Sequence, residues 1–398
     1  MRKIIIIGFG LVLLISGCTT TADTSPSHTP TAAALPLLPT ETPLPSSTPL
    51  PTATLEPSTA LTATVWTTDP YVSIMTYHQF AANHAERSKA LKVRFEDFEI
   101  QLNRMYDAGF SLISLDDWMS GNMVVPEGRR PLVFTMDDLY FNNQLRLDEN
   151  GEPRPDTGIG ILWEFYQEHP DFGFSCALFP NLGNKLFADP SKDTWEMELA
   201  EAIVWGMDHD LMPYNHFYTH PQLDISEPGA ILWEAEKNDI YLRELITMAG
   251  REDLIPELDN ILALTYGVWP RGNGINVMLS YTNPEGEPVR GVMEIGPISV
   301  VGNQPPVYAP DYDPMMILRH TASPSSIDYL IEHAEDYPRA QACDLGMVPD
   351  RLLGDAEGLG QFVLETATTN GCADGVYVVN EMLFRIDMGS VEVLVGSR

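Results

Sequence analysis

Residues 131–140 read PLVFTMDDLY, a mostly apolar run that ends in two adjacent carboxylates, Asp137 and Asp138. The run before the carboxylates has no charged residue and is rich in bulky side chains, which predicts a buried strand. The carboxyl end of a buried strand is where α/β folds place their reactive groups. Because successive residues leaving a strand point in different directions, one carboxylate can bind a metal ion while the other accepts a proton.

Strand-like and helix-like segments alternate on both sides of this run. Apolar residues at helical spacing predict helices, whereas short apolar runs between turn residues predict strands. The predicted strands are 71–77, 110–115, 131–136, 174–179 and 261–269, and the predicted helices are 95–108, 158–167, 195–207 and 230–248. This alternation is typical of an α/β protein, either a parallel barrel or a doubly wound sheet.

One segment departs from the alternation. Residues 276–302 alternate like antiparallel strands around the turn NPEG at 283–286, which predicts a β-hairpin inserted in the domain, over the site. Residues 336–398 are short and mixed in pattern, and we interpret them as a C-terminal extension. The predicted main domain therefore covers residues 67–335.

A second group of possible ligands lies downstream of the carboxylates. His216 and His220 are four residues apart, which would put them on one face of a helical turn. Two imidazoles and one carboxylate make a three-ligand site with an open position, a common arrangement for catalytic zinc. Phe217 stands where the metalloprotease pattern H-E-x-x-H has its glutamate, so that pattern does not apply. A polar loop without metal is the alternative interpretation.

The order of these pieces resembles the polysaccharide deacetylase family of carbohydrate esterases. TMDDLY at 135–140 resembles the family's T-F-D-D-G-Y motif, and NHFYTHP at 215–221 resembles its N-H-T-x-x-H-P motif. Weaker similarity extends over Tyr77-His78, 95–98, 109–115 and 172–179, so that the resemblance covers residues 70–330. It implies a deformed (β/α) barrel and a hydrolase that removes N-acetyl groups from a polysaccharide or peptidoglycan.

The resemblance also implies roles for single residues. Asp138, His216 and His220 would bind a divalent metal, with zinc expected, and Asp137 would be the general base. In the family, the amide that stabilises the oxyanion lies in a Y-P-Y-G segment. The nearest match here is WPRG, in which Arg271 would supply the N–H group.

The proton for the leaving amine has more than one candidate source. Many family members use a histidine in an L-x-H motif, and Leu318-Arg319-His320 fits this pattern, which would make His320 the general acid. Another branch has a P-R-I-type segment at this place, and residues 317–319 fit that pattern equally. His320 could otherwise be a solvated loop residue, and His78 a structural histidine near the mouth of the first strand.

Three positions depart from the family's motifs. Leu139 replaces a glycine, Phe217 replaces a hydroxyl residue, and Arg271 stands where an aromatic residue is usual. The metal ligands are thus kept while the surrounding groove differs. A weak or inactive glycan-binding protein on the same fold is therefore the alternative to an active deacetylase. A glycosidase would need a pair of carboxylates across the scissile bond, and no motif marks such a pair.

The N-terminus predicts export. Arg2 and Lys3 precede the apolar run 4–15, which is short for a membrane span and typical of a secretory signal. Cys18 directly after Ser-Gly resembles the bacterial lipobox, which implies a signal peptide over residues 1–17 and acylation of the Cys18 thiol. An ordinary signal peptide with a chance cysteine, or an uncleaved anchor, is the alternative.

The next segment, residues 18–66, is dominated by Thr, Ser, Ala and Pro and is predicted to be an extended tether. A lipid on Cys18 would hold the protein at a membrane, with the folded domain facing the periplasm or the outside. The formal net charge of −33 argues against nucleic acid as a partner. Cys343 and Cys372 are candidates for a disulfide, which an exported protein permits.

Overall fold

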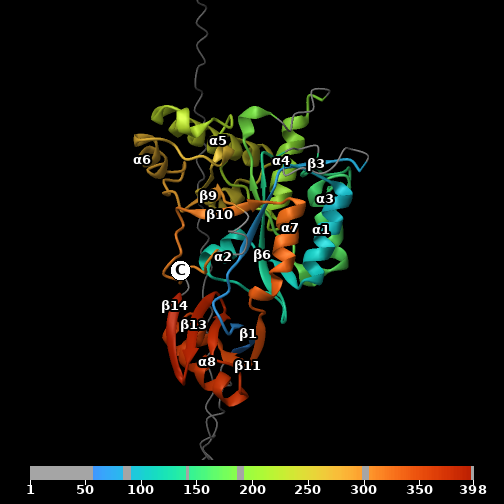
Figure 1. The fold of residues 1–398 in the computed structure, drawn as a ribbon. Helices are drawn as coiled ribbons and strands as arrows, with labels where there is room; N and C mark the ends of the chain where they lie inside the picture. The colour runs from blue at the N-terminus through green and yellow to red at the C-terminus, as the bar shows by residue number, and fades with distance from the viewer. Residues whose placement is uncertain (1–56, 84–90, 140–142, 186–191, 298–303, 396–398) are drawn as a thin grey trace, which may run out of the picture. The chain divides into compact units, whose positions relative to one another are not determined.

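The structure, a computed structural model, describes residues 57–83, 91–139, 143–185, 192–297 and 304–395, all within one unit of the chain, residues 55–398 (Figure 1). The predicted signal peptide, Cys18 and the first part of the predicted tether lie outside the described residues. Within the described ranges, we find no helix that is both long and apolar enough to cross a membrane.

The main sheet has seven strands, all paired in parallel, in the order β5-β6-β2-β10-β9-β8 with β7 also beside β6. The strands are β2 (Ser73–Tyr77), β5 (Phe110–Leu112), β6 (Arg130–Asp137), β7 (Ala177–Phe179), β8 (Ile261–Ala263), β9 (Gly291–Ile295) and β10 (Ile317–Thr321). Parallel strands connected largely through helices confirm the α/β class that the sequence predicted. The apolar run at residues 131–136 lies in β6, which pairs with β2, β5 and β7.

A short segment that is not itself a strand continues the main sheet from β7 to β8. The amide of Tyr214 donates to the carbonyl oxygen of Leu178 in β7 (2.7 Å), and the amide of Asn215 donates to that of Ile261 in β8 (3.1 Å). Backbone hydrogen bonds therefore run from β7 through Tyr214 and Asn215 to β8, as a deformed barrel requires. This segment leads directly into His216.

Helices cover the outer side of the main sheet (Figure 1). They are α1 (Phe95–Asp107), α3 (Gly158–Glu168), α4 (Trp195–Met207), α5 (Pro228–Met248), α6 (Asn273–Leu279) and α7 (Pro324–Glu332). The short helix α2 (Leu115–Ser120) instead contributes Leu115, Trp118 and Met119 to the core on the inner side of the sheet. In α1, the buried residues Phe98, Leu102 and Met105 recur at the spacing of one helix face. They share a core with residues of α3, α4, α5 and α7. A separate pair of short parallel strands, β3 (Gln79–Ala81) and β4 (Lys92–Arg94), precedes α1.

The side chains of β6 alternate between two cores. Phe134 packs with helix residues such as Phe98, whereas Val133 packs with residues of other strands such as Ile317 of β10. The inner core is therefore an apolar layer built by several strands. Asp137 lies four residues after Val133 on the same strand, so its side chain points to the inner side above this layer.

The predicted hairpin over residues 276–302 is wrong. Its first residues belong to α6, and Gly291–Ile295 form β9, which pairs in parallel with both β8 and β10. The predicted turn is present, because Thr282 and Pro288 form a single antiparallel bridge around it. Alternating polarity in a short run did not distinguish a hairpin from a helix end followed by one parallel strand.

The C-terminal residues form a second sheet together with a strand near the N-terminus. This strand lies in residues 18–66, which were predicted to be an extended tether. The order of the second sheet is β11-β1-β12-β13-β14, all antiparallel, and β1 lies inside the sheet between β11 and β12. The strands are β1 (Ser58–Trp66), β11 (Gln341–Pro349), β12 (Gly375–Val379), β13 (Met382–Asp387) and β14 (Ser390–Val395). The predicted tether is therefore wrong for residues 58–66, which form β1, and residues 336–398 are more than a short extension.

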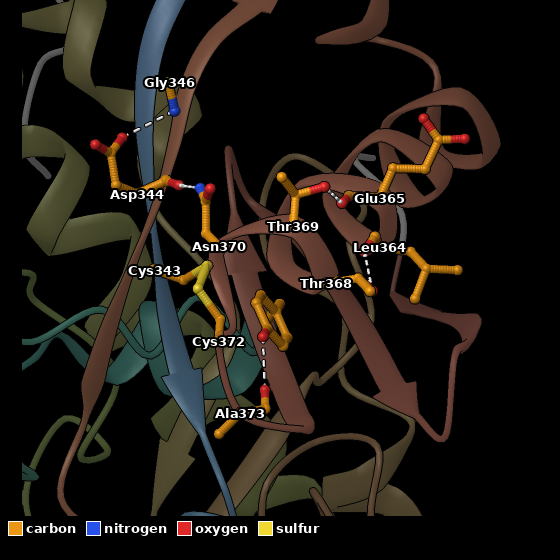
Figure 2. Close-up of a disulfide and its surroundings, with 11 residues drawn as sticks. Cys343, Asp344, Gly346, Leu364, Glu365, Thr368, Thr369, Asn370, Cys372 and Ala373 are labelled. Atoms are coloured by element: carbon orange, nitrogen blue, oxygen red, sulfur yellow. Dashed lines mark hydrogen bonds between the residues drawn. A yellow bond between two sulfur atoms is a disulfide. The ribbon is translucent and has the colours of Figure 1, made fainter.

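Helix α8 (Ala356–Asn370) packs on one face of this sheet and encloses a core of its own, which includes Val65, Val363 and Phe384. A disulfide joins Cys343 of β11 to Cys372, which follows α8 (Figure 2). The other face contributes Trp66, Val376 and Leu383 to the inner core of the main sheet. The last residues of β1 are apolar on both faces because Val65 faces the core under α8 and Trp66 faces the inner core of the main sheet.

Candidate active site

The chain turns sharply where β6 ends. Asp138 and Leu139 have φ angles of 71° and 38°, in the left-handed region that residues other than glycine rarely adopt. Leu139 therefore has the backbone shape for which a glycine was expected. Its side chain is buried in the core shared with α1 and α3, and this apolar burial offsets the cost of the turn.

Three potential metal ligands lie together beyond this turn. The Nε2 atoms of His216 and His220 are 3.7 Å and 3.6 Å from the same oxygen, Oδ1 of Asp138. One ligand atom from each of the three residues lies within 4.8 Å of the others. A carboxylate and two imidazoles at this separation can hold a divalent metal with room for a further ligand. The sequence had predicted that these three residues act together.

The histidine loop reaches this geometry without the helical turn that the spacing suggested. Residues 213–220 contain no helix, and Phe217 and His220 have left-handed φ angles of 57° and 53°. The loop therefore folds back on itself and brings His220 beside His216, with ring centroids 4.9 Å apart. Phe217 is buried in an apolar core with residues such as Ile231 of α5. That core contact takes the place of the hydroxyl group expected at this position.

His216 is held in an orientation suited to a metal ligand. Its Nδ1 lies 3.0 Å from the carbonyl oxygen of Ala263 at the end of β8, so the Nδ1–H donates there and Nε2 faces the carboxylates. Burial lowers the pKa of His216 to about 3, although Asp137 acts in the opposite direction. The imidazole is therefore neutral at physiological pH, which leaves the Nε2 lone pair available.

Asp138 has its own support. The side-chain amide of Asn181 donates to Oδ1 of Asp138 over 2.5 Å. Asn181 follows β7, the strand next to β6, and is almost fully buried. The sequence analysis missed this residue, although its place just after the predicted strand 174–179 was a usable signal.

Asp137 is held separately, by Arg319 of β10. The guanidinium donates from Nη1 to Oδ1 over 2.5 Å and from Nη2 to Oδ2 over 2.7 Å, and both side chains are at least 97% buried. Nη1 also donates to the Thr135 hydroxyl (3.1 Å). Burial alone would raise the pKa of Asp137, but Arg319, followed by His216 and His78, outweighs it and lowers the pKa to about 2.

His78, directly after β2, completes the group around Asp137. Its Nε2 lies 3.7 Å from Oδ2 of Asp137. Burial is the largest influence on its pKa and lowers it, although the carboxylates of Asp137 and Asp138 act in the opposite direction. Gln144 donates its side-chain amide to the carbonyl oxygens of both His78 and Asp137, which ties the ends of β2 and β6 together.

One predicted site residue lies apart from this group. His320 follows Arg319 in β10, so its side chain points to the opposite face of the strand, and its Nδ1 lies 3.0 Å from the carbonyl oxygen of Gly296. The Arg271 side chain is 76% exposed and donates to Asp224 over 2.6 Å, and the role of its backbone N–H group stays a prediction. The structure thus places Arg319, rather than His320, against Asp137.

An aromatic residue that the sequence analysis overlooked lies beside the ligands. The ring of Tyr266 contacts that of His220 edge-on, with centroids 4.4 Å apart, and its side chain is largely exposed. Its φ of 54° is a strained value for a bulky residue. Tyr266 lies three residues after β8, where a parallel sheet carries functional side chains, and this position was the available signal.

Comparison with known proteins gives structural likeness only. No known protein family and no curated protein matches the chain. Among solved structures it is similar to the deacetylase PplD of Streptococcus pyogenes, solved in complex with acetate (15% identity, TM-score 0.45, covering 67% of this chain and 98% of that one). It is also similar to a polysaccharide deacetylase from Bacillus cereus (16% identity, TM-score 0.44, 67% and 69%) and to IcaB from Ammonifex degensii (14%, 0.41, 67% and 97%). The chain is thus distantly similar, over about two thirds of its length, to these three solved structures.

Proposed function

We propose that the protein is a metal-dependent hydrolase that removes N-acetyl groups from a cell-surface or cell-wall polysaccharide. The observation that carries this proposal is the division of labour between two adjacent carboxylates. Asp138 lies near His216 and His220, whereas Asp137 is bonded to Arg319 and lies near His78, with His216 at 3.7 Å from both carboxylates. A ligand carboxylate beside a separately held carboxylate is what hydrolysis by an activated water needs.

The donor set fits a divalent metal, and zinc suits it best. One oxygen and two imidazole nitrogens leave a coordination position for water or substrate, which is the usual arrangement at catalytic zinc. Asp138, His216 and His220 would hold the ion. When bound, it supplies a Lewis acid that polarises a carbonyl group and acidifies water.

Asp137 is suited to be the general base. With its pKa lowered to about 2, it is ionised at neutral pH. The two parallel hydrogen bonds from Arg319 fix the carboxylate plane, so Asp137 can take a proton without turning away. Oδ2 of Asp137 lies 3.7 Å from Nε2 of His78 and 3.7 Å from Nε2 of His216. This oxygen therefore lies toward the metal ligands.

For the leaving amine, the geometry favours His78 over His320 as the proton donor. His78 lies next to Asp137, from which it can receive a proton, whereas His320 is on the far face of β10. Tyr266, whose ring contacts that of His220, is placed to line the space beside the metal ligands. We therefore assign catalysis to Asp137 and His78, with Arg319 as the residue that positions Asp137.

A weak or inactive glycan-binding protein was the alternative, suggested by Leu139, Phe217 and Arg271. The first two side chains are buried in apolar cores and so point away from the metal ligands. No described contact favours the alternative over the hydrolase. We further propose that the substrate is met outside the cell, with the domain held to a membrane by a lipid on Cys18.

The test is the metal content and acetate release of a soluble fragment beginning at Leu55. Acetylated chito-oligosaccharides and peptidoglycan serve as substrates, with and without added zinc. We expect about one metal per chain, from the one three-ligand site among the described residues, and acetate release that depends on it. Bound metal and glycan without acetate release would support the alternative, and a chain without metal would overturn the site.

Two variants separate the two carboxylates. Asp138→Ala is expected to lose metal and activity together, because a ligand is removed. Asp137→Asn is expected to keep the metal and to lose activity by about a hundredfold or more, because the base is gone. Metal content by atomic absorption and initial rates of acetate release measure both effects. Unchanged activity in both variants would contradict the proposal.

A further inference from the structure

One face of α5 contacts the loop that carries two of the metal ligands and the loop that supports the third. The loop after β7 carries Asn181, the hydrogen-bond partner of Asp138, and the loop after residue 214 carries His216 and His220. Both loops lie against the first half of α5, where Glu234 and Asn238 are spaced one helical turn apart and are both buried. Buried polar side chains on a helix are costly unless they are fully bonded, so their partners are informative.

Asn238 joins the two loops to each other. Its Oδ1 accepts from the amide of Leu182 (2.9 Å), and its Nδ2 donates to the carbonyl oxygen of Pro180 (2.9 Å). These two residues flank Asn181, so Asn238 fixes the backbone from which Asn181 reaches Asp138. The same Nδ2 lies 3.4 Å from Oδ1 of Asn215, the residue before His216. Asn238 is itself fully buried.

Glu234 holds the other end of the histidine loop. Its Oε2 accepts from the amide of Thr219 and its Oε1 accepts from the Thr219 hydroxyl, both over 2.6 Å. The carbonyl oxygen of Glu234 also accepts from the amide of Tyr218 (3.1 Å). Thr219 directly precedes His220, whose left-handed backbone needs such support because it is strained.

We infer that Glu234 and Asn238 are positioning residues that set the metal affinity of the Asp138, His216 and His220 cluster from one rigid helix. This inference rests on the proposed metal site. Hydrogen bonds link α5 to a residue that supports or adjoins each ligand. These residues are Asn181 for Asp138, Asn215 for His216 and Thr219 for His220. Groups that orient ligands in this way commonly change metal affinity by 10- to 100-fold when removed.

The experiment measures the dissociation constant for zinc, by competition with a chromophoric chelator, in fragments beginning at Leu55. Glu234→Ala and Asn238→Ala are expected to weaken zinc binding by at least about tenfold. Glu234→Gln keeps an oxygen that accepts from the Thr219 amide and a group that can bond the Thr219 hydroxyl. Its dissociation constant for zinc is therefore expected to stay within about threefold of the wild-type value, a smaller change than the loss of an orienting group causes. Glu236→Ala is the matched control, because Glu236 is an exposed glutamate on the same helix.

A second readout tests orientation rather than stability. The visible spectrum of the cobalt-substituted protein reports ligand geometry, and it is expected to change in Glu234→Ala but not in Glu236→Ala. Should Glu234→Ala not fold, Thr219→Ala decides the matter, because Thr219 is exposed and this change removes only the hydroxyl bond. If Glu234→Ala folds and leaves both the zinc affinity and the cobalt spectrum unchanged, the inference is overturned, and the proposed hydrolase is not affected. If Glu234→Ala does not fold, the same result in Thr219→Ala overturns the inference. A wild-type chain that binds no zinc would instead overturn the proposed function.

Discussion

At the residue scale, Arg319 is the residue that holds Asp137 in place, a role that was not predicted from the sequence. Its guanidinium is fully buried and makes a two-bond contact with Asp137, over Phe179, whose ring centroid lies 5.0 Å from the guanidinium carbon. Buried ion pairs add little net stability, but removing one partner leaves a buried charge without compensation. The ion pair itself therefore adds little stability, but removal of Arg319 would leave the Asp137 carboxylate buried without a cation.

This asymmetry gives a prediction for Arg319→Met. The substitution leaves the Asp137 carboxylate buried and without its cation, and is expected to reduce the free energy of unfolding by about 3–5 kcal/mol. The double variant Asp137→Asn with Arg319→Met removes both charges and is expected to recover much of that loss. Urea unfolding of the metal-free fragments measures both values. Equal stability of the single and double variants would contradict the account.

The ligands could be predicted from sequence, whereas their supports could not. Asp138, His216 and His220 stand in two motifs at fixed spacing, so their types and order are visible without a structure. Arg319 and Asn181 reach the site from other strands, and nothing in their local sequence indicates which carboxylate each one contacts. Contacts across a sheet depend on strand order, which single-residue patterns do not contain.

At the element scale, α5 carries a second buried carboxylate, Asp239, next to the positioning residues. The Tyr281 hydroxyl donates to its Oδ2 (2.8 Å), and Nη1 of Arg243 lies 3.9 Å from its Oδ1. Burial raises the pKa of Asp239 from 3.8 to about 6, and Arg243 and Tyr281 only partly oppose this. At a pH between these two pKa values, Asp239 is protonated in the folded chain and ionised in the unfolded chain.

The sign of the resulting pH dependence follows from that proton. Stability contributed by Asp239 is present below about pH 4 and falls as the pH rises to about 6, by about 3 kcal/mol in total at 1.36 kcal/mol per pKa unit. Asp239→Asn cannot titrate and is expected to lack this decline. Unfolding free energies of both proteins, measured from pH 4 to pH 7 with a chelator present, give the difference. Parallel curves for the two proteins would refute the assignment.

Elements with strong local patterns were predicted well, and elements defined by distant partners were not. The helical spacing in α1 and the apolar run of β6 predicted both elements, because their own residues carry the pattern. β1 lies in a segment rich in Thr and Pro, and its partners β11 and β12 come more than 270 residues later. Its pairing could therefore not be read locally, and the segment was mistaken for tether.

At the scale of the whole molecule, the N-terminal and C-terminal parts of the chain complete one sheet. Val65 pairs with both Gln341 of β11 and Tyr377 of β12. Trp66 donates from Nε1 to the carbonyl oxygen of Met123 and belongs to the inner core, so β1 connects the second sheet to the main sheet. The stability of the catalytic part thus depends on residues well before its first strand.

A pair of fragments tests this dependence. A fragment beginning at Leu55 keeps β1 and is expected to unfold cooperatively. A fragment beginning at Thr67 loses the strand between β11 and β12, exposes the edges of both, and is expected to aggregate or to melt at least about 10 °C lower. Size-exclusion chromatography and thermal unfolding distinguish the two. Indistinguishable melting of the two fragments would show that β1 is dispensable.

The position of β1 also determines how the protein would respond to tension. If a lipid on Cys18 holds the chain to a membrane while the enzyme grips an immobile polymer, the pulling force enters the folded part at Ser58. A pull along β1 loads its hydrogen bonds to β11 and β12 together, in shear, instead of opening them one after another. The second sheet then acts as a mechanical clamp where the load enters, ahead of the strands β6 and β10 that carry Asp137 and Arg319.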